Sequence, residues 1–220
     1  IHNTDQLLNY LKANTNVTII DLREIMIETK KICKPYGQFD SHWNQCAASA
    51  AYKYIIDYID IKKKIKFNKI NYSLTLTKNC DWGDLVRMYT KVLPGTLHRI
   101  RDGCFRYNTK FASKSCNPKR SKGRWFFTIT CDKNYQYKKA IIFHDSFFSQ
   151  LAPFFNRSFN NSSYVLNRLT KGRLQKELFK KELEACGYEA CGSNNAILPT
   201  DLVIEQWVER YFNSKGHAFR

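Results

Sequence analysis

The chain has 220 residues, which suits one compact domain over residues 1–220 with a full hydrophobic core. A hydrophobic content of 43% excludes a disordered chain, and no apolar run of about 18 residues occurs that would cross a membrane. Lys+Arg 36 against Asp+Glu 19 give a formal net charge of +17, which fits a merely soluble basic surface or attraction to nucleic acid, an anionic membrane or an acidic polysaccharide.

The first part of the chain has the hydrophobic spacing of helices around one strand-like run. Residues 16–22 read NVTIIDL, a β-branched run between polar residues that is typical of a buried strand. An Ala-rich stretch farther along, CAASAAY, suits close helix packing. In chain order we predict a helix over 4–14, a strand over 16–22, a helix over 22–31, an extended segment at 38–42 and a helix over 44–58.

The second part alternates strand-like and helical patterns. The run KAIIF at 139–143 is short and apolar, and apolar residues recur at helical spacing directly after it. We predict strand pieces in 62–80, a short helix over 82–89, a strand from 97 interrupted by a basic loop at 110–124, strands over 125–131, 139–143, 164–166 and 202–204, and helices over 174–186 and 205–212. Strands that alternate with helices predict an α/β fold with a mainly parallel sheet.

Ser146 lies in the turn between a predicted buried strand and a helix. In open α/β sheets the active site lies at the carboxyl ends of the strands. The start of a helix also offers backbone N–H groups and a positive dipole end, which stabilise an oxyanion. Ser146 is therefore a candidate nucleophile. The alternative is that Asp145 or Ser146 only caps the helix, a role that both residue types favour.

A nucleophilic serine needs a base, and the base needs a carboxylate to orient it. Of the five histidines, His42 lies in an extended segment two residues after Asp40, and residues i and i+2 of such a segment lie on one side. We predict that Asp40 orients His42 and that His42 faces Ser146. His144 adjoins Ser146 on the strand, so we expect its side chain to point elsewhere. An ordinary loop at 40–42 is the alternative.

The eight cysteines are even in number, and none has the spacing of a zinc ligand, so we predict no metal site. Disulfides in an oxidising compartment would explain an even count. The closest pairs along the chain are Cys186–Cys191 and Cys104–Cys116. The alternative is a set of scattered, buried free thiols.

Two segments, FDSHWN at 39–44 and IIFHDSF at 141–147, together resemble the alginate O-acetyltransferase family, the AlgX/AlgJ-like branch of the SGNH hydrolases. That family has a D-[ST]-H-W-N segment upstream of a strand that ends in D-S-F. WGDL at 82–85 and TDLVIEQWVERYF at 200–212 are further matches, so the resemblance extends over nearly the whole chain. It implies a three-layer SGNH-hydrolase-like domain, and the short stretch before residue 39 implies a domain truncated at its N-terminus.

The resemblance also implies a function: acetyl transfer through Ser146, with His42 and Asp40, onto an extracytoplasmic polysaccharide such as alginate. It implies a membrane-bound acyltransferase as acetyl donor, a periplasmic or other extracytoplasmic location with membrane association through a missing N-terminal segment, and no cofactor or nucleic-acid partner. We expect substrate contacts from the residues beside the triad, which are Trp43, Asn44 and Asp145.

Two other functions fit the same sequence. A carbohydrate esterase would use the same triad with water as the acceptor. A catalytically inactive basic module would bind glycan or nucleic acid, and basic residues interleaved with aromatics at 119–127 (KRSKGRWFF) favour it.

Overall fold

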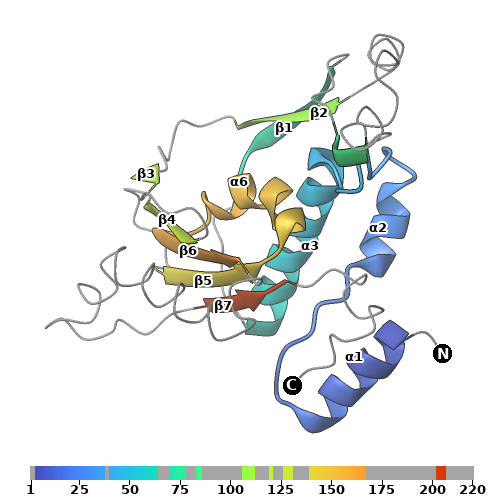
Figure 1. Ribbon diagram of the computed structural model, residues 1–220, viewed down its shortest axis with the longest axis vertical. Helices are drawn as coiled ribbons and strands as arrows, with labels where there is room; N and C mark the ends of the chain where they lie inside the picture. The colour runs from blue at the N-terminus through green and yellow to red at the C-terminus, as the bar shows by residue number, and fades with distance from the viewer. Residues whose placement is uncertain are drawn as a thin grey trace, which may run out of the picture.

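The computed structural model describes residues 3–37, 40–63, 70–77, 83–85, 106–111, 119–120, 126–130, 139–166 and 202–206. Figure 1 shows helices from the first part of the chain beside a sheet built from its later part. The predicted helix at 174–186, residues 207–212 of the helix predicted after it, and the cysteine pairs Cys186–Cys191 and Cys104–Cys116 lie outside the described residues.

Three helices form the first part: α1 (Asn3–Asn14), α2 (Arg23–Thr29) and α3 (Gln45–Lys63), each close to its predicted position. The predicted strand at 16–22 is wrong, because this segment joins α1 to α2 without pairing to a strand in the described part of the chain. Its side chains Ile20 and Leu22 pack against the core formed by helices and sheet. Side-chain burial here does not need a sheet partner. None of the helices among the described residues combines the length and hydropathy needed to cross a membrane.

Among the described residues, the main sheet has five strands in the order β3-β4-β6-β5-β7. Strands β5 (Lys139–His144), β6 (Asn161–Leu166) and β7 (Leu202–Glu205) are parallel, with β5 in the middle. Strands β4 (Phe126–Thr130) and β3 (Lys119–Arg120) extend this sheet in antiparallel fashion beyond β6. The predicted start of the last helix, at residue 205, is wrong, because Glu205 is the last residue of β7. The α/β fold is confirmed, and its parallel part is the set of three strands around β5.

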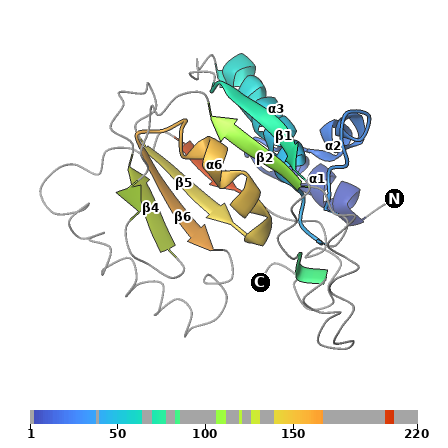
Figure 2. The ribbon, with the colours of Figure 1, turned by 90° about the horizontal axis from the view of Figure 1, so that it is seen from above.

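A separate antiparallel pair, β1 (Tyr72–Thr77) and β2 (Arg106–Phe111), packs over α3. After β5 the chain enters the 3-10 helix η1 (Ser146–Gln150) and the short helix α6 (Ala152–Phe155). Figures 1 and 2 show η1, α6 and α3 on one face of the sheet. The predicted strand–turn–helix at 139–155 is therefore present, with a 3-10 turn before the α-helix.

The core lies between this face of the sheet and α3. Ala47, Ala48 and Ala51 on α3 have no exposed surface, and these small side chains let the helix approach the sheet closely. From the other side Ile142 of β5 and Phe154 of α6 fill the space, and both are fully buried. The Ala-rich run thus serves close packing, as predicted. The packing holds the carboxyl end of β5 next to the start of α3, and the candidate site lies there.

Candidate active site

The turn after β5 presents Ser146. Asp145 has an extended backbone, and its Oδ1 accepts a hydrogen bond of 2.8 Å from the N–H of Phe147, so that Asp145 caps η1. Gln206, just beyond β7, fixes the same turn from the neighbouring strand: its Oε1 accepts from the Asp145 N–H at 3.1 Å, and its own N–H donates to the Phe143 carbonyl at 2.9 Å. Asp145 is buried while the next residue, Ser146, is exposed.

The segment before α3 presents Asp40 and His42. Asn44 begins α3, because its side-chain oxygen accepts hydrogen bonds from the N–H groups of Cys46 and Ala47. Its N–H also donates to the Pro35 carbonyl at 2.8 Å, and its side-chain amide donates to the Lys34 carbonyl at 2.6 Å. These two bonds bring residues 34 and 35 next to the start of α3.

A disulfide between Cys33 and Cys46, thirteen residues apart in the sequence, joins the chain before this segment to α3. Both cysteines are buried. Spacing along the sequence favours the closest pairs and does not single out this one.

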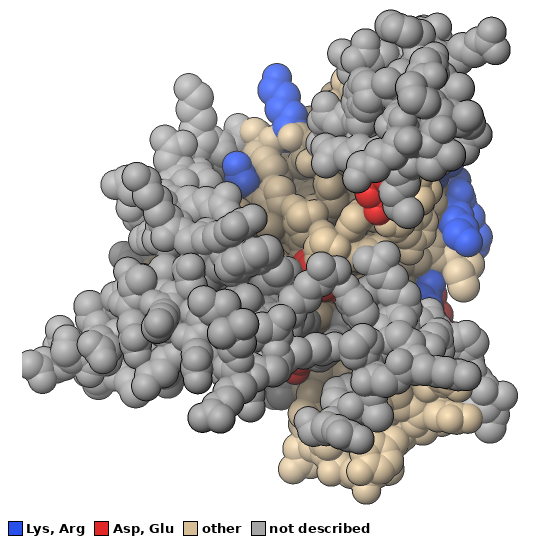
Figure 3. Space-filling model, in the orientation of Figure 1, with Lys and Arg blue, Asp and Glu red and all other residues tan. Residues whose placement is uncertain are grey.

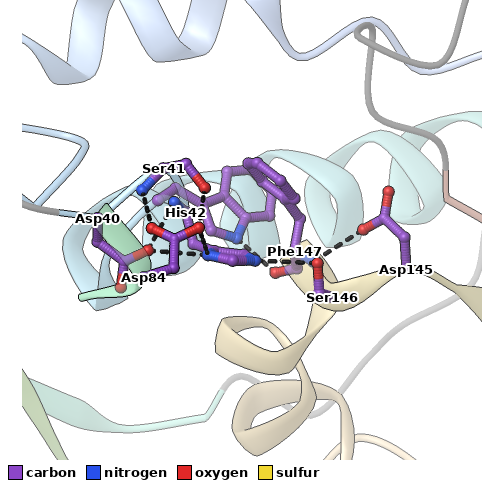
Figure 4. Close-up of polar contacts among 8 residues, drawn as sticks. Asp40, Ser41, His42, Asp84, Asp145, Ser146 and Phe147 are labelled. Atoms are coloured by element: carbon purple, nitrogen blue, oxygen red, sulfur yellow. Dashed lines mark hydrogen bonds and ion pairs between the residues drawn. The ribbon is translucent and has the colours of Figure 1, made fainter. Parts of the chain in front are cut away.

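His42 joins the two segments, as Figure 4 shows. Its Nδ1 lies 2.8 Å from Oδ1 of Asp40, and its Nε2 lies 2.9 Å from Oγ of Ser146. The Asp40 carboxylate can only accept a hydrogen bond, so it selects the tautomer with a proton on Nδ1, and Nε2 then accepts from the Ser146 hydroxyl. The three residues that the sequence predicted as a triad are thus within hydrogen-bond distance, in the required order.

Trp43 and Phe147 hold the two segments together beside this chain of contacts. The indole Nε1 of Trp43 donates to the Phe147 carbonyl at 2.6 Å. The ring of Phe147 packs against the imidazole of His42, with centroids 4.7 Å apart. The imidazole therefore has one apolar face, while its two nitrogens contact polar partners.

Asp84 is a second carboxylate at the same imidazole. It comes from a segment, residues 83–85, that is remote in the sequence from both parts of the triad. Its Oδ2 lies 3.6 Å from Nδ1 of His42, and it accepts hydrogen bonds from the backbone N–H (2.7 Å) and the hydroxyl of Ser41. Partial burial by itself would raise the pKa of Asp84, but the two bonds from Ser41, a hydrogen bond with the Asp40 carboxyl group and the nearby His42 lower that pKa to about 2.

The donor atoms of Asp40, His42 and Asp84 all lie within 4.8 Å of one another, as in a group that can hold a metal ion. An ion there would bind the lone pair of Nδ1, and the neutral ring would then carry its proton on Nε2, facing Ser146. In that state the ring cannot accept the serine proton. Metal binding at this group therefore competes with the use of His42 as a base.

His144 points away from the site, as its place on β5 predicted. Its Nδ1 donates to the Asp145 carbonyl at 2.8 Å, and its ring packs against Phe148 and Tyr164. Burial lowers the pKa of His144, which favours its neutral form.

The three residues predicted to contact substrate, which are Trp43, Asn44 and Asp145, make hydrogen bonds within the protein that hold the site in shape. Trp43 and Asp145 are 7% and 3% exposed, so they present little surface to a ligand. Asn44 has both ends of its amide in use at the start of α3. Their hydrogen bonds hold the two segments in shape, and direct contact with a substrate stays a prediction for each of them.

The oxyanion site predicted at Ser146 needs a free backbone N–H. Within the described residues, no acceptor is bonded to the Ser146 N–H. The helix that begins there is a five-residue 3-10 helix, which is too short to have a large dipole. The N–H group itself, more than a helix dipole, is therefore what this turn offers to an oxyanion.

Sequence reasoning missed Asp84, Gln206 and the Cys33–Cys46 bond as parts of the site. For Asp84 there was a signal, because WGDL at 82–85 was one of the matched segments, but it was not assigned a role. Gln206 lies in the last matched segment, 200–212, and also had no role. The disulfide had only its spacing, which did not distinguish it from other pairs.

No family model matches the chain, and no curated protein is similar to it. Solved structures are similar. PatB1 from Bacillus cereus is 16% identical with a TM-score of 0.59, and the match covers 100% of this chain and 79% of that one. The O-acetyltransferase domain of Pseudomonas putida AlgJ is 14% identical (TM-score 0.52; 96% and 65% covered), and a DHHW family protein from Eubacterium siraeum is also 14% identical (TM-score 0.54; 93% and 69%). At such identities the likeness shows the fold alone, and it agrees with the predicted α/β fold.

Proposed function

We propose that the chain is a serine-dependent O-acetyltransferase that forms an acetyl-enzyme on Ser146 and passes the acetyl group to a polysaccharide hydroxyl. The observation that carries this proposal is the position of His42, whose two ring nitrogens contact Asp40 at 2.8 Å and Ser146 at 2.9 Å. The similar fold of an O-acetyltransferase domain, that of AlgJ, supports acetyl transfer in particular.

In the first half-reaction His42 Nε2 accepts the hydroxyl proton of Ser146 while Oγ attacks the acetyl carbonyl of the donor. The negative charge that develops on the carbonyl oxygen is stabilised by the Ser146 N–H. The bond to the donor's leaving group breaks, and the proton on His42 goes to that group. Asp40 stabilises the imidazolium and keeps it in the required orientation throughout.

In the second half-reaction a sugar hydroxyl takes the place of the departed group. His42 accepts its proton, the hydroxyl oxygen attacks the acetyl-serine, and Oγ leaves with the proton from His42. Because Ser146 is exposed, a large acceptor can approach it. The same exposure admits water, so a carbohydrate esterase is the second candidate function.

The acceptor that we propose is an anionic, alginate-like polysaccharide outside the cytoplasm, with a membrane-bound acyltransferase as donor. The net charge of +17 supports an anionic acceptor. Figure 3 shows one face of the molecule. The Lys and Arg side chains of the described residues lie apart from one another on this face and form no single basic patch there. A disulfide at Cys33–Cys46 supports an oxidising, extracytoplasmic compartment.

The test uses p-nitrophenyl acetate as donor with wild type and Ser146→Ala. We expect p-nitrophenol release by wild type, a loss of about 10³-fold or more in the variant, and acetylated product when a uronate oligosaccharide is added. If acetate is released and no acetylated oligosaccharide forms, the protein is an esterase and the proposed transferase activity is wrong. If wild type and Ser146→Ala are equally inactive and both still bind glycan, the chain is a catalytically inactive binding module.

A second, independent test is covalent labelling. One of the similar solved structures is of PatB1 with a sulfonyl adduct, and a sulfonyl fluoride reacts with activated nucleophiles. We expect phenylmethanesulfonyl fluoride to add one sulfonyl group to the tryptic peptide that contains Ser146, and His42→Gln to slow this addition. Addition at an unchanged rate would show that His42 does not activate Ser146.

A further inference from the structure

Asp84 makes contacts that the triad does not account for. Its carboxylate uses one oxygen for the Ser41 backbone N–H and the other for the Ser41 hydroxyl, across 43 residues of sequence. The second oxygen also lies 3.6 Å from Nδ1 of His42. Figure 4 shows Asp84 next to Ser41 and the imidazole, across the ring from Ser146.

The bonds of Asp40 explain why this contact matters. Oδ1 of Asp40 accepts from the backbone N–H of His42 at 2.9 Å and contacts Nδ1 of the same residue at 2.8 Å. Both bonds are inside the 40–42 turn, and the link of Asp40 to another element is its hydrogen bond with the Asp84 carboxyl group. Ser41, between the two, is the residue through which Asp84 fixes that turn to a remote segment.

We propose that Asp84 is a positioning residue of this site, which anchors the Asp40–His42 turn through Ser41 and places a second negative charge beside the His42 imidazolium. The inference rests on the proposed function in one respect, that His42 acts as the base. In this arrangement two carboxyl groups, hydrogen-bonded to each other, lie at the same nitrogen of His42, opposite the nitrogen that contacts Ser146.

The charged groups around the ring are few. Asp40 and Asp84 face Nδ1, with side chains 36% and 39% exposed. On the η1 side the Asp145 carboxylate is buried and bonded to the Phe147 N–H. Within the described part of the chain, no Lys or Arg pairs with Asp40 or Asp84. The negative charge of this hydrogen-bonded pair therefore acts on the imidazolium, damped by solvent since both groups are partly exposed.

Anchoring and charge can be separated by substitution. Asp84→Asn keeps the size of the side chain and one oxygen that accepts from the Ser41 N–H, but its amide nitrogen cannot accept the bond from the Ser41 hydroxyl, and the charge is removed. Ser41→Ala removes the hydroxyl bond and leaves the charge. Asp5→Asn is the matched control, because Asp5 on α1 is 41% exposed, pairs with Arg23 and contacts no residue of the site.

The experiment measures kcat/KM for p-nitrophenyl acetate against pH for the wild type and these three variants. For Asp84→Asn we expect a loss of about tenfold in kcat with KM within about twofold, and an acidic limb of the profile that moves to lower pH by about one unit at low salt, because the protonated ring loses a stabilising charge. Ser41→Ala should lose about threefold with an unmoved limb. Asp5→Asn should match wild type. An Asp84→Asn profile with the wild-type limb would overturn the proposal.

A second readout does not depend on activity. In the Ser146→Ala background, the ¹⁵N resonances of the His42 ring are followed by NMR through a pH titration, with and without Asp84→Asn, and assigned by their loss in His42→Gln. We expect the midpoint to fall in the Asp84→Asn protein. An unchanged midpoint overturns the charge role of Asp84 even if the chain is active. A shifted midpoint in a chain that never transfers acetyl supports Asp84 while the proposed function fails.

Discussion

The two halves of the candidate site are held in different ways. Ser146 follows a central strand of the sheet, and the register of β5 with its two neighbours, together with the Asp145 cap, determines where it lies. Asp40 and His42 lie in an irregular segment whose described residues have an isolated bridge, Tyr36 to Trp43, in place of regular strand pairing. Regular backbone hydrogen bonding thus places the nucleophile, whereas side-chain contacts and a disulfide place the base.

This difference indicates which half of the site is more sensitive to substitution. A strand in the middle of a sheet is fixed by many backbone bonds, and the turn after it is held by two side chains, Asp145 and Gln206, so that its position does not depend on one contact alone. The loop depends on a few contacts: the Cys33–Cys46 bond, the Trp43 indole and the Asp84 carboxylate. We therefore expect changes on the loop side to alter catalysis more than changes of similar size on the strand side.

The largest effect in this comparison is expected from Asp40→Asn. The amide can donate to Nδ1, which favours the tautomer with a proton on Nε2, and that tautomer cannot accept the serine proton. In serine triads this change costs about 10⁴-fold in kcat. Here Asp84 lies 3.6 Å from the same nitrogen and opposes the wrong tautomer, so we expect about 10²- to 10³-fold. Steady-state kinetics on p-nitrophenyl acetate measure it.

A double variant, Asp40→Asn with Asp84→Asn, sharpens this prediction. If Asp84 compensates in part for Asp40, the double variant should lose more than the product of the two single losses. A loss equal to that product would show that the two carboxylates act independently.

Removing the disulfide should affect the loop half next. In Cys33→Ser/Cys46→Ser the closed loop of the unfolded chain is released, which costs about 3 kcal/mol of stability for a loop of this length. We expect a fall in the free energy of unfolding, measured in urea, and a lower kcat because the 40–42 turn loses a restraint. Each single serine variant should match the double variant, since either breaks the bond. Reduction of wild type is a poorer test, because six other cysteines are present.

The strand half of the site could be predicted from the sequence to a greater extent than the loop half. The β5–η1 turn came from local signals, a short apolar run and a change of periodicity, and these persist because a buried parallel strand is apolar throughout. The run at 16–22 has an equally good local signal, yet it pairs with no described strand, because its Ile20 and Leu22 find apolar partners in the core. Propensity describes what a segment tolerates, and tertiary contacts decide what it forms.

On the loop side the informative contacts are remote in sequence. Asp40 and His42 were paired by the i, i+2 rule, which is local, and their geometry agrees with it. The contact of Ser41 with Asp84 crosses 43 residues and leaves no periodicity to detect. The disulfide was not predicted for a related reason. Cys33 and Cys46 are separated by about as many residues as Cys104 and Cys116. Spacing alone does not reveal that Asn44 brings the chain back to Lys34 at the start of α3.

Trp43→Phe tests the link between the halves and should have a smaller effect. The phenyl ring still fills the core, but the Phe147 carbonyl loses its indole donor in a buried place, which costs about 1–2 kcal/mol. Because this bond joins the loop to η1, we expect kcat to fall about threefold to tenfold with a slight rise in KM. Tyr54→Phe, at an exposed position of α3, is the control and should change neither value. If Trp43→Phe destabilised the protein without slowing it, the two halves would be aligned by the core alone.

The smallest effect is expected on the strand side, from His144→Asn. Burial holds the pKa of His144 below the ordinary value of 6.5, so the folded state binds its proton less readily than the unfolded state. The stability contribution is therefore fully present above about pH 6.5 and is lost as the pH falls from there toward the lowered pKa of the folded protein. An asparagine amide can reach the Asp145 carbonyl in place of Nδ1 and does not titrate.

We therefore expect urea unfolding to show that wild type loses more stability than His144→Asn between about pH 7.5 and about pH 5, while the other titrating groups cancel in the difference. The rate of acetyl ester hydrolysis at about pH 7.5 should stay within about twofold of wild type, because Asp145 is fixed from the other side by Gln206. A large loss of rate in His144→Asn would break the comparison, since it would mean that the nucleophile, too, depends on a single side-chain contact.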